Sequence, residues 1–184
     1  MEPALTTGAL VLHDLGLAAG FGGALFGKFS LGPAVRVIGD KKERGKVLET
    51  AWGGYKWLNA ISLGAVALTW IAGRSAFSGR FLGRRARNLV ITKDLLLGTT
   101  VVASIASGVL GSYLGSENGG YVPVEEGGKP APEATPQQRR AQRAVSIIGS
   151  VNLIAMAGVI GVTAWLMQRA SSSARWTALS RVLP

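Results

Sequence analysis

Four long apolar blocks dominate this chain of 184 residues, and they restrict the folds open to it more than any other feature. The charged residues, only 16% of the chain, gather mostly between the blocks. A helix needs about 20 mostly apolar residues to cross the hydrocarbon core of a bilayer. We therefore predict an all-α integral membrane protein, a four-helix up-and-down bundle forming one domain over residues 1–184. The four blocks are Gly8 to Phe26, Trp57 to Ala72, Leu95 to Leu114 and Val145 to Met167.

Helix start and stop signals mark the connections between these blocks. Gly32-Pro33 predicts a break or kink, and Asp40 with Glu43 has the spacing of a capping box, so a helix should begin at Lys41. Thr135 and Pro136 read as the N-cap and first residue of the last helix. The Pro-, Glu- and Gly-rich segment 118–135 is typical of a mobile loop. The tail, residues 170–184, alternates arginines with Trp and Leu and is expected at the membrane interface.

The net charge of +10 is carried by connections that would meet anionic headgroups. No zinc-finger or RNP-like pattern accompanies it, so we expect membrane lipids as partners and no nucleic acid. Four spans place both termini on one side. Lys and Arg are almost evenly divided between the two sides. We expect the termini on the cytoplasmic side, because the second connection is basic without acids while segment 118–135 looks extracytoplasmic.

Small residues recur at steps of three and four on two of the predicted helices. Such spacing makes one narrow stripe along a helix, against which a neighbouring helix can pack closely. The stripe on the first helix includes His13, and that on the third includes Lys93, Thr100 and Ser107. We predict that these stripes serve helix packing; their small residues are Gly16, Gly20, Gly23 and Gly27 on the first helix and Ser104, Gly108, Gly111 and Gly115 on the third.

Ionisable residues inside membrane spans are costly, which makes them the strongest candidates for a functional site. His13 and Asp14 begin the first span, and Lys93 and Asp94 begin the third. Parallel helices bring these pairs to the same membrane level, so we expect an Asp14–Lys93 pair. Two interpretations stay open: a proton-relay, substrate or ligand site, or a polar clamp close enough to the headgroups to meet water.

Asn59 and Asn152 come early in the second and fourth helices and share a depth nearer the opposite surface. We predict that they form a second polar layer, held by an interhelical hydrogen bond in preference to ion coordination.

The chain has one histidine and no cysteine, which limits its chemistry. Thiolate zinc sites, cysteine-ligated iron–sulfur clusters, multi-histidine metal centres and bis-histidine haem within one subunit are excluded. A His13–Met haem using Met156 or Met167, or a site completed across a dimer, stays open. No nucleophile elbow, phosphate loop or dinucleotide fingerprint occurs. We therefore predict no enzyme activity, no metal site and no cofactor.

The stretch from His13 to Phe26, with Gly22-Gly23-Ala24-Leu25-Phe26, resembles the first span of small four-helix bacterial membrane families. In these families, which include the copper-resistance D-type membrane domains and uncharacterised relatives, a His near the helix start precedes Gly-Gly and Phe. The resemblance covers one span and implies a four-helix protein of the bacterial cytoplasmic (inner) membrane. The additional His and Met residues that copper handling would need are absent.

Three functions are compatible with these features. The first is a non-enzymatic accessory or scaffold subunit that associates with itself or with other membrane protein subunits. The second is a small oligomeric transporter or channel with an Asp14/Lys93 coupling site. The third is a subunit that binds lipid, quinone or haem using His13.

Overall fold

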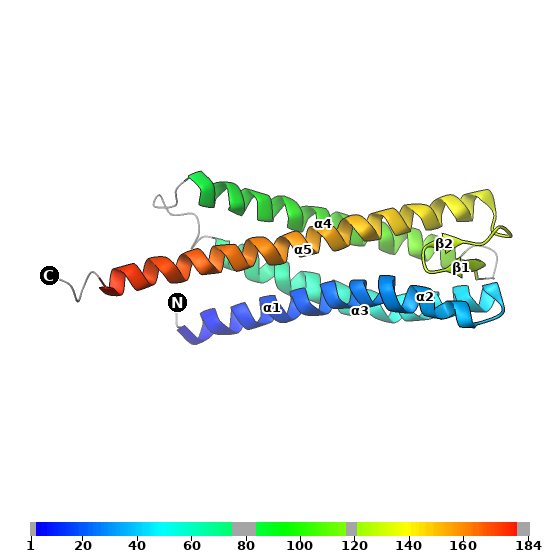
Figure 1. Ribbon diagram of the computed structural model, residues 1–184, viewed down its shortest axis with the longest axis horizontal. Helices are drawn as coiled ribbons and strands as arrows, with labels where there is room; N and C mark the ends of the chain where they lie inside the picture. The colour runs from blue at the N-terminus through cyan, green and yellow to red at the C-terminus, as the bar shows by residue number, and fades with distance from the viewer. Residues whose placement is uncertain (1–2, 75–83, 117–120, 180–184) are drawn as a thin grey trace.

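The computed structural model describes residues 3–74, 84–116 and 121–179, with side chains over 7–73, 87–115 and 121–168. Four long helices lie side by side in an elongated bundle (Figure 1). They are α1 (Pro3–Phe26) with its continuation to Val37, α3 (Lys41–Arg74), α4 (Arg84–Ser116) and α5 (Pro136–Leu179). The predicted all-α class is therefore correct for the described residues, apart from one short hairpin.

The first helix does not break at Gly32-Pro33 but changes its winding. A π-helical turn η1 (Gly27–Leu31) leads into α2 (Gly32–Ala34) and a final 3₁₀ turn η2 (Val35–Val37). Pro33 has no N–H to bond the carbonyl one turn back, and the N–H of Gly32 reaches instead to the carbonyl of Gly27. The helix then ends at Ile38, which is extended.

The predicted caps position the next elements as expected. The Asp40 carboxylate accepts hydrogen bonds from the N–H groups of Lys42 and Glu43, at 2.7 and 3.0 Å, and α3 begins at Lys41. At the start of α5, the Gln138 N–H donates to the Thr135 hydroxyl, while the Gln138 side chain accepts from the Thr135 N–H. Both arrangements satisfy N–H groups that a helix leaves free at its first turn.

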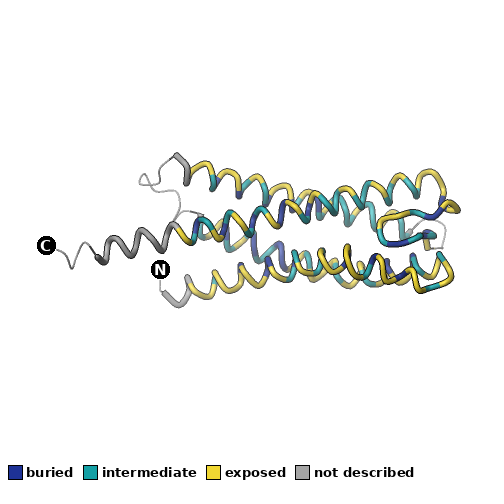
Figure 2. The backbone as a smooth tube through the Cα atoms, in the orientation of Figure 1, coloured by how far each residue is buried: buried dark blue, intermediate teal, exposed yellow. Residues whose placement is uncertain are grey.

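The helices pack as two pairs. α1 lies most extensively against α3, and α4 against α5, with sparser contact between the pairs. A core between them is formed by seven buried side chains: Leu17, Val66, Trp70, Val90, Leu97, Val159 and Leu166. Most large apolar side chains instead face outward, so exposed surface runs along all four helices (Figure 2). An outward apolar surface is the pattern of helices that contact lipid.

Three helical stretches are long and apolar enough to cross a membrane: Thr7–Val37, Arg87–Gly115 and Pro136–Gln168. α3 is not among them, because its apolar stretch is short and Lys56 and Arg74 bound it. Its second half nevertheless exposes large apolar side chains, among them Trp57, Ile61 and Leu68 at 70% each. The structure thus gives four bundled helices, three of which meet the criterion for a span.

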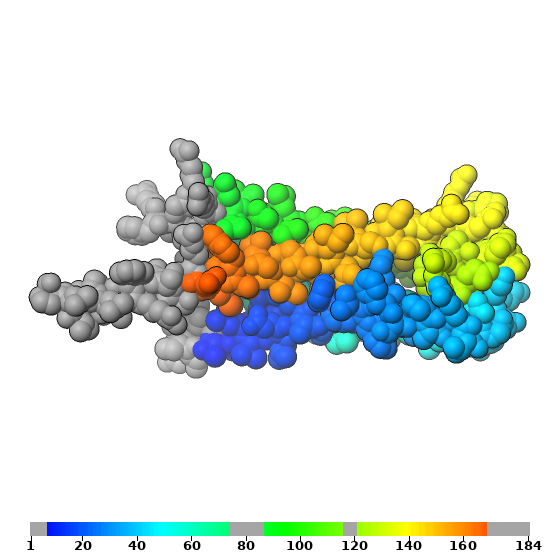
Figure 3. Space-filling model, in the orientation of Figure 1, coloured from blue at the N-terminus to red at the C-terminus, as the bar shows by residue number. Residues whose placement is uncertain are grey.

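Residues 121–135 of the expected mobile loop 118–135 contain a short hairpin, and residues 118–120 lie outside the described residues. In the hairpin, β1 (Val124–Glu126) pairs antiparallel with β2 (Lys129–Pro130), and the turn between them needs the positive φ of Gly128, 80°. Val122, Val124 and Ala131 are buried, so the segment does have apolar residues to bury. Residues 121–135, hereafter the hairpin cap, fill one end of the bundle beside the start of α5 (Figure 3).

Close glycine contacts and ion pairs hold the hairpin cap in place. A Cβ on Gly45 of α3 would lie 2.1 Å from the Val122 carbonyl oxygen, and one on Gly127 would lie 2.5 Å from the Cα of Gly32. Only residues without side chains allow these approaches. Cationic side chains of the η2–α3 region then contact the acidic residues of the cap: Arg36 contacts Glu126, Arg44 contacts Glu125, and Lys41 contacts both Glu125 and Glu133.

The expected interfacial tail lies largely outside the described side chains. α5 continues as a helix through Leu179, so no break separates the tail from the fourth helix. Its placement at the interface stays a prediction.

Candidate functional site

The buried polar cluster lies where α1, α3 and α4 meet near the end of the bundle that carries the N-terminus. Its centre is the Lys93 side chain of α4, which is only 2% exposed. Lys93 Nζ lies 3.1 Å from His13 Nε2 and 4.0 Å from the centre of the Trp70 ring. The ammonium therefore has one hydrogen-bond acceptor and one aromatic face within reach.

The partners of His13 define its tautomer. Its Nδ1 lies 2.9 Å from the Thr69 hydroxyl, and that hydroxyl donates its own proton to the Ala65 carbonyl at 2.6 Å. Nδ1 must then carry the hydrogen in this contact, which leaves Nε2 as an acceptor for the Lys93 ammonium. The neutral imidazole of His13, on α1, thus lies between Thr69 of α3 and Lys93 of α4 and connects the three helices.

Asp94 completes the cluster from the adjacent position. The Trp70 indole N–H donates to its carboxylate at 2.8 Å, which joins α3 to α4 a second time. Trp70 thus contacts both neighbours on α4: its ring faces Lys93 and its N–H bonds Asp94. A negative charge next to the buried ammonium offsets part of the cost of burying it.

The expected Asp14–Lys93 pair is not formed. The Asp14 side chain is exposed, and in the described part of the chain no ion pair joins it to Lys93. The neighbouring residue, His13, takes its place, because successive residues of a helix point about 100° apart and only His13 faces the bundle interior. The sequence did not lead us to place Thr69 and Trp70 in this cluster. The signal that could have done so is a hydroxyl and an indole near the end of an otherwise apolar helix.

The second polar layer joins three helices through Ser104. Its hydroxyl oxygen accepts from the Asn59 side chain at 3.3 Å and from the Asn152 side chain at 3.4 Å. The two asparagines thus meet a shared serine on α4. Tyr55 adds a hydroxyl that donates to the Gly20 carbonyl and lies 3.4 Å from Asn59 Oδ1. The Asn152 Oδ1 atom is buried without a hydrogen-bond partner.

The glycines predicted for packing divide into two groups. Each of those on α1, and Gly27 at the start of η1, faces α3 or α5: a Cβ on Gly16 would meet the Ser62 carbonyl, on Gly20 the Met156 side chain, on Gly23 the Tyr55 ring and on Gly27 the Trp52 ring. On α4, by contrast, a Cβ on Gly108 or Gly111 would meet nothing within 4 Å, and Gly115 faces only the Glu49 carboxylate. Gly108 and Gly111 therefore form no close helix contact with the part of the chain that the structure describes.

No group of three or more His, Asp or Glu side chains that could hold a metal ion occurs among the described residues. Comparison with known proteins adds no relative, since no family model, curated protein or solved structure matches this chain. The fold and the composition together define a helical bundle in which three helices are long and apolar enough to cross a membrane.

Proposed function

We propose that this chain is a non-enzymatic multi-pass membrane protein that acts as an accessory or scaffold subunit of a membrane complex. The observation that supports it is how the buried polar groups are used. His13, Lys93 and Asp94 bond to each other or to Thr69 and Trp70, and every one of these contacts joins two helices. The cluster thus acts as a clamp between the α1/α3 pair and α4.

The α4 glycines give this subunit a surface for association. Gly108 and Gly111 have open space where a Cβ would stand, beside the exposed side chains of Ile105 and Val109. In lipid, a second helix packs closely on small residues. This face would serve contact with another membrane subunit or with a second copy of the chain.

The experiment is purification in mild detergent with quantitative identification of co-purifying proteins. Gly108→Leu would block the association face, and Gly64→Leu on α3 is the matched control, because its Cβ would also meet nothing within 4 Å. The expected result is a stoichiometric partner, or a dimer, that Gly108→Leu removes and Gly64→Leu retains. A monomer without partners in every variant would contradict the proposal.

A small transporter or channel is the second candidate, and one observation favours it. The two polar layers join the helix pairs where packing is sparser, and they include a buried ammonium and an unpartnered amide oxygen. Helix pairs that separate along a polar seam could expose it alternately to either side. In this case proton- or ion-coupled flux into liposomes would be abolished by Lys93→Met, while Lys56→Met, at an exposed position, would retain it.

A further inference from the structure

The contact between His13 and Lys93 has room for only one hydrogen. Lys93 Nζ and His13 Nε2 lie 3.1 Å apart, and both side chains are buried, at 2% and 4% exposed. The other imidazole nitrogen, Nδ1, uses its hydrogen on the Thr69 hydroxyl at 2.9 Å. A proton added to Nε2 would therefore leave two donors and two positive charges facing each other, and this hydrogen bond between α1 and α4 would be lost.

The charged groups around the imidazole determine whether a second proton can be held there. α4 presents the Lys93 ammonium and, beside it, the Asp94 carboxylate, and α1 presents Asp14. α3 and α5 also pack against α1, but their described apolar stretches, residues 57–73 and 144–168, carry no charged side chain. With the imidazole protonated, the cluster would hold two positive and two negative charges. The second proton would thus break the contact without leaving a net charge in the membrane.

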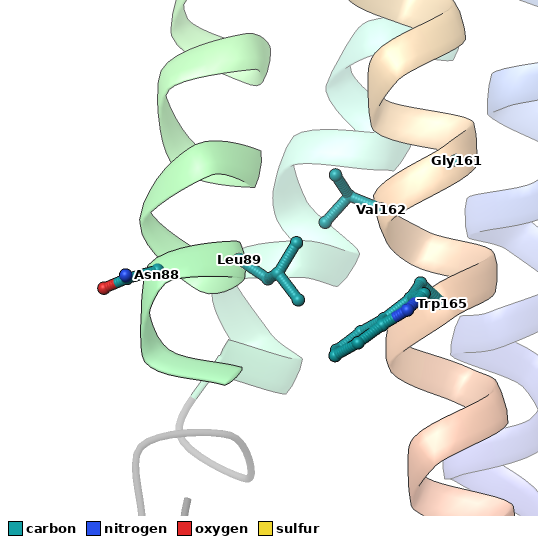
Figure 4. A pocket seen from close by; sticks show the side chains of 5 residues that line it. All are labelled: Asn88, Leu89, Gly161, Val162 and Trp165. Atoms are coloured by element: carbon teal, nitrogen blue, oxygen red, sulfur yellow. The ribbon is translucent and has the colours of Figure 1, made fainter. Parts of the chain in front are cut away.

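Contacts that do not depend on charge hold the two helices of each pair together. Within α1/α3, a Cβ on Gly16 would lie 2.8 Å from the Ser62 carbonyl oxygen, so the two backbones are in close contact. Within α4/α5, Figure 4 shows Leu89 of α4 facing Val162 and Trp165 of α5, and all three pack against the core. Each pair should therefore move as a unit when the polar link between the pairs is lost.

We propose that this cluster is a pH switch, in which protonation of His13 separates the α1/α3 pair from the α4/α5 pair at the end of the bundle that carries the N-terminus. The proton comes from water, and the hydrogen bond from Lys93 to Nε2 breaks as the new N–H bond forms. Histidine readily changes charge between about pH 5 and 8, so mild acid drives the change. The apolar core beside the cluster keeps the pairs attached, which makes the opening local. The inference rests on the proposed function, in which the cluster is a clamp, and adds its regulation.

The test measures distances between spin labels in the full chain, in phosphatidylcholine vesicles with both sides at about pH 8 or about pH 5. The chain has no cysteine, so labels attach only to introduced ones. Leu12→Cys with Ile91→Cys labels exposed positions of α1 and α4, one on each pair. Their separation should grow by about 2 Å or more in acid. Leu12→Cys with Ile71→Cys labels the α1/α3 pair alone and should keep its distance.

Two substitutions assign the response to the cluster. His13→Gln keeps an acceptor for Lys93 but takes up no proton, and Lys93→Gln removes the second cation and offers an oxygen to a protonated imidazole. Either substitution should abolish the acid-induced separation. No separation in the wild-type chain, or the same separation in either variant, would overturn the inference.

A further pair of variants tests the compensating charge. Asp14→Asn removes one of the two carboxylates beside the cluster and should move the midpoint of the separation to lower pH by about half a pH unit. Glu49→Gln removes an exposed carboxylate nearer the other end of the bundle and should leave the midpoint unchanged. Equal shifts in both variants would mean that the response follows the net charge of the chain and not the cluster.

The same preparations distinguish failure of this inference from failure of the proposed function. A chain that co-purifies a partner or forms a dimer, but shows no acid-induced separation, would lose only the switch. A chain that has no partner in any variant, but separates in acid as described, would keep the switch and lose the scaffold role.

Discussion

The ammonium of Lys93 lies 3.1 Å from His13 Nε2, which connects α4 to α1 at a point where both side chains are buried. This contact replaces the expected pair with Asp14 and changes which double mutant should show coupling. It also predicts that replacing either Lys93 or His13 lowers the free energy of unfolding.

Lys93→Met and His13→Leu should each lower the free energy of unfolding in detergent, by roughly 1–3 kcal/mol, because each leaves a buried polar group without its partner. The double mutant should recover about 1 kcal/mol relative to the sum. The measurement is a double-mutant cycle by thermal or denaturant unfolding. Asp14→Asn with Lys93→Met is the control, and its coupling should be smaller, since Asp14 is exposed and acts on Lys93 through Coulomb attraction without an ion pair. Coupling to Asp14 but not to His13 would show that the ammonium has the other partner.

Asn59 and Asn152 both donate to Ser104, but replacing each by leucine should lower the free energy of unfolding by different amounts. Asn59 also lies near the Tyr55 hydroxyl, whereas Asn152 keeps one oxygen unpartnered. Asn152→Leu removes that oxygen and should cost about 1 kcal/mol less than Asn59→Leu. Comparison of unfolding midpoints in one detergent measures the difference. A larger loss for Asn152→Leu would mean that its oxygen has a partner such as a bound water molecule.

Gly16→Ala should destabilise the α1/α3 pair by roughly 1–3 kcal/mol, because the new Cβ would lie 2.8 Å from the Ser62 carbonyl oxygen and backbone cannot move aside easily. Gly22→Ala is the matched control on the same helix, since its Cβ meets nothing within 4 Å. The control should be neutral or gain up to about 1 kcal/mol from helix propensity. Unfolding midpoints of both variants test this, and equal effects would show that α1 does not pack on α3 at Gly16.

Docking of the hairpin cap should depend on pH through Lys41. The ammonium of Lys41, through the hydrogen bond that it donates, holds the pKa of Glu133 below its ordinary 4.5, and the hydrogen bonds that Lys41 donates to Glu125 and Glu133 raise its own pKa above 10.5. The contribution of Glu133 is present above pH 4.5 and is lost as the pH falls through its lowered pKa. The contribution of Lys41 is present below pH 10.5 and is lost as the pH rises through its raised pKa.

Hydrogen exchange of residues 121–135 measures this docking, after correction for the intrinsic rate at each pH. Protection should be highest at intermediate pH and should fall on the acid side. Lys41→Met should lower protection at neutral pH, and Lys42→Met, whose side chain is exposed, should not. Fast exchange throughout in the unmodified chain would support the mobile loop expected from composition.

Four spans require both termini on one side of the membrane. Reporters inserted after Gly39 and after Gly120 should therefore fall on the side opposite to reporters inserted after Ser78 and at the C-terminus. This tests α3 in particular, because it does not meet the composition criterion that the other three helices meet. An N-terminal reporter on the side opposite to a C-terminal one would indicate three spans, with α3 outside the bilayer.

The sequence alone determined the four helices and the residues at which two of them begin. Asp40 and Thr135 cap α3 and α5 as predicted, because capping depends on bonds between residues two or three apart. The apolar blocks likewise predict helices by length, since the backbone in lipid must satisfy its own hydrogen bonds. The position of each polar residue along its helix also follows from the sequence. Counting residues from the helix ends was therefore enough to predict the two polar layers.

Only the tertiary structure decided which polar groups meet. Helical periodicity fixes the angle between His13 and Asp14 but not the rotation of the whole helix, and the approach of Gly16 to the Ser62 carbonyl sets that rotation. His13 consequently faces Lys93 while Asp14 faces outward. The hairpin in residues 121–135 could not be predicted for the same reason. Val124 is buried against Val35 and Leu48, and Gly32 and Gly45 allow the close approach, but no local sequence pattern records a contact between such distant segments.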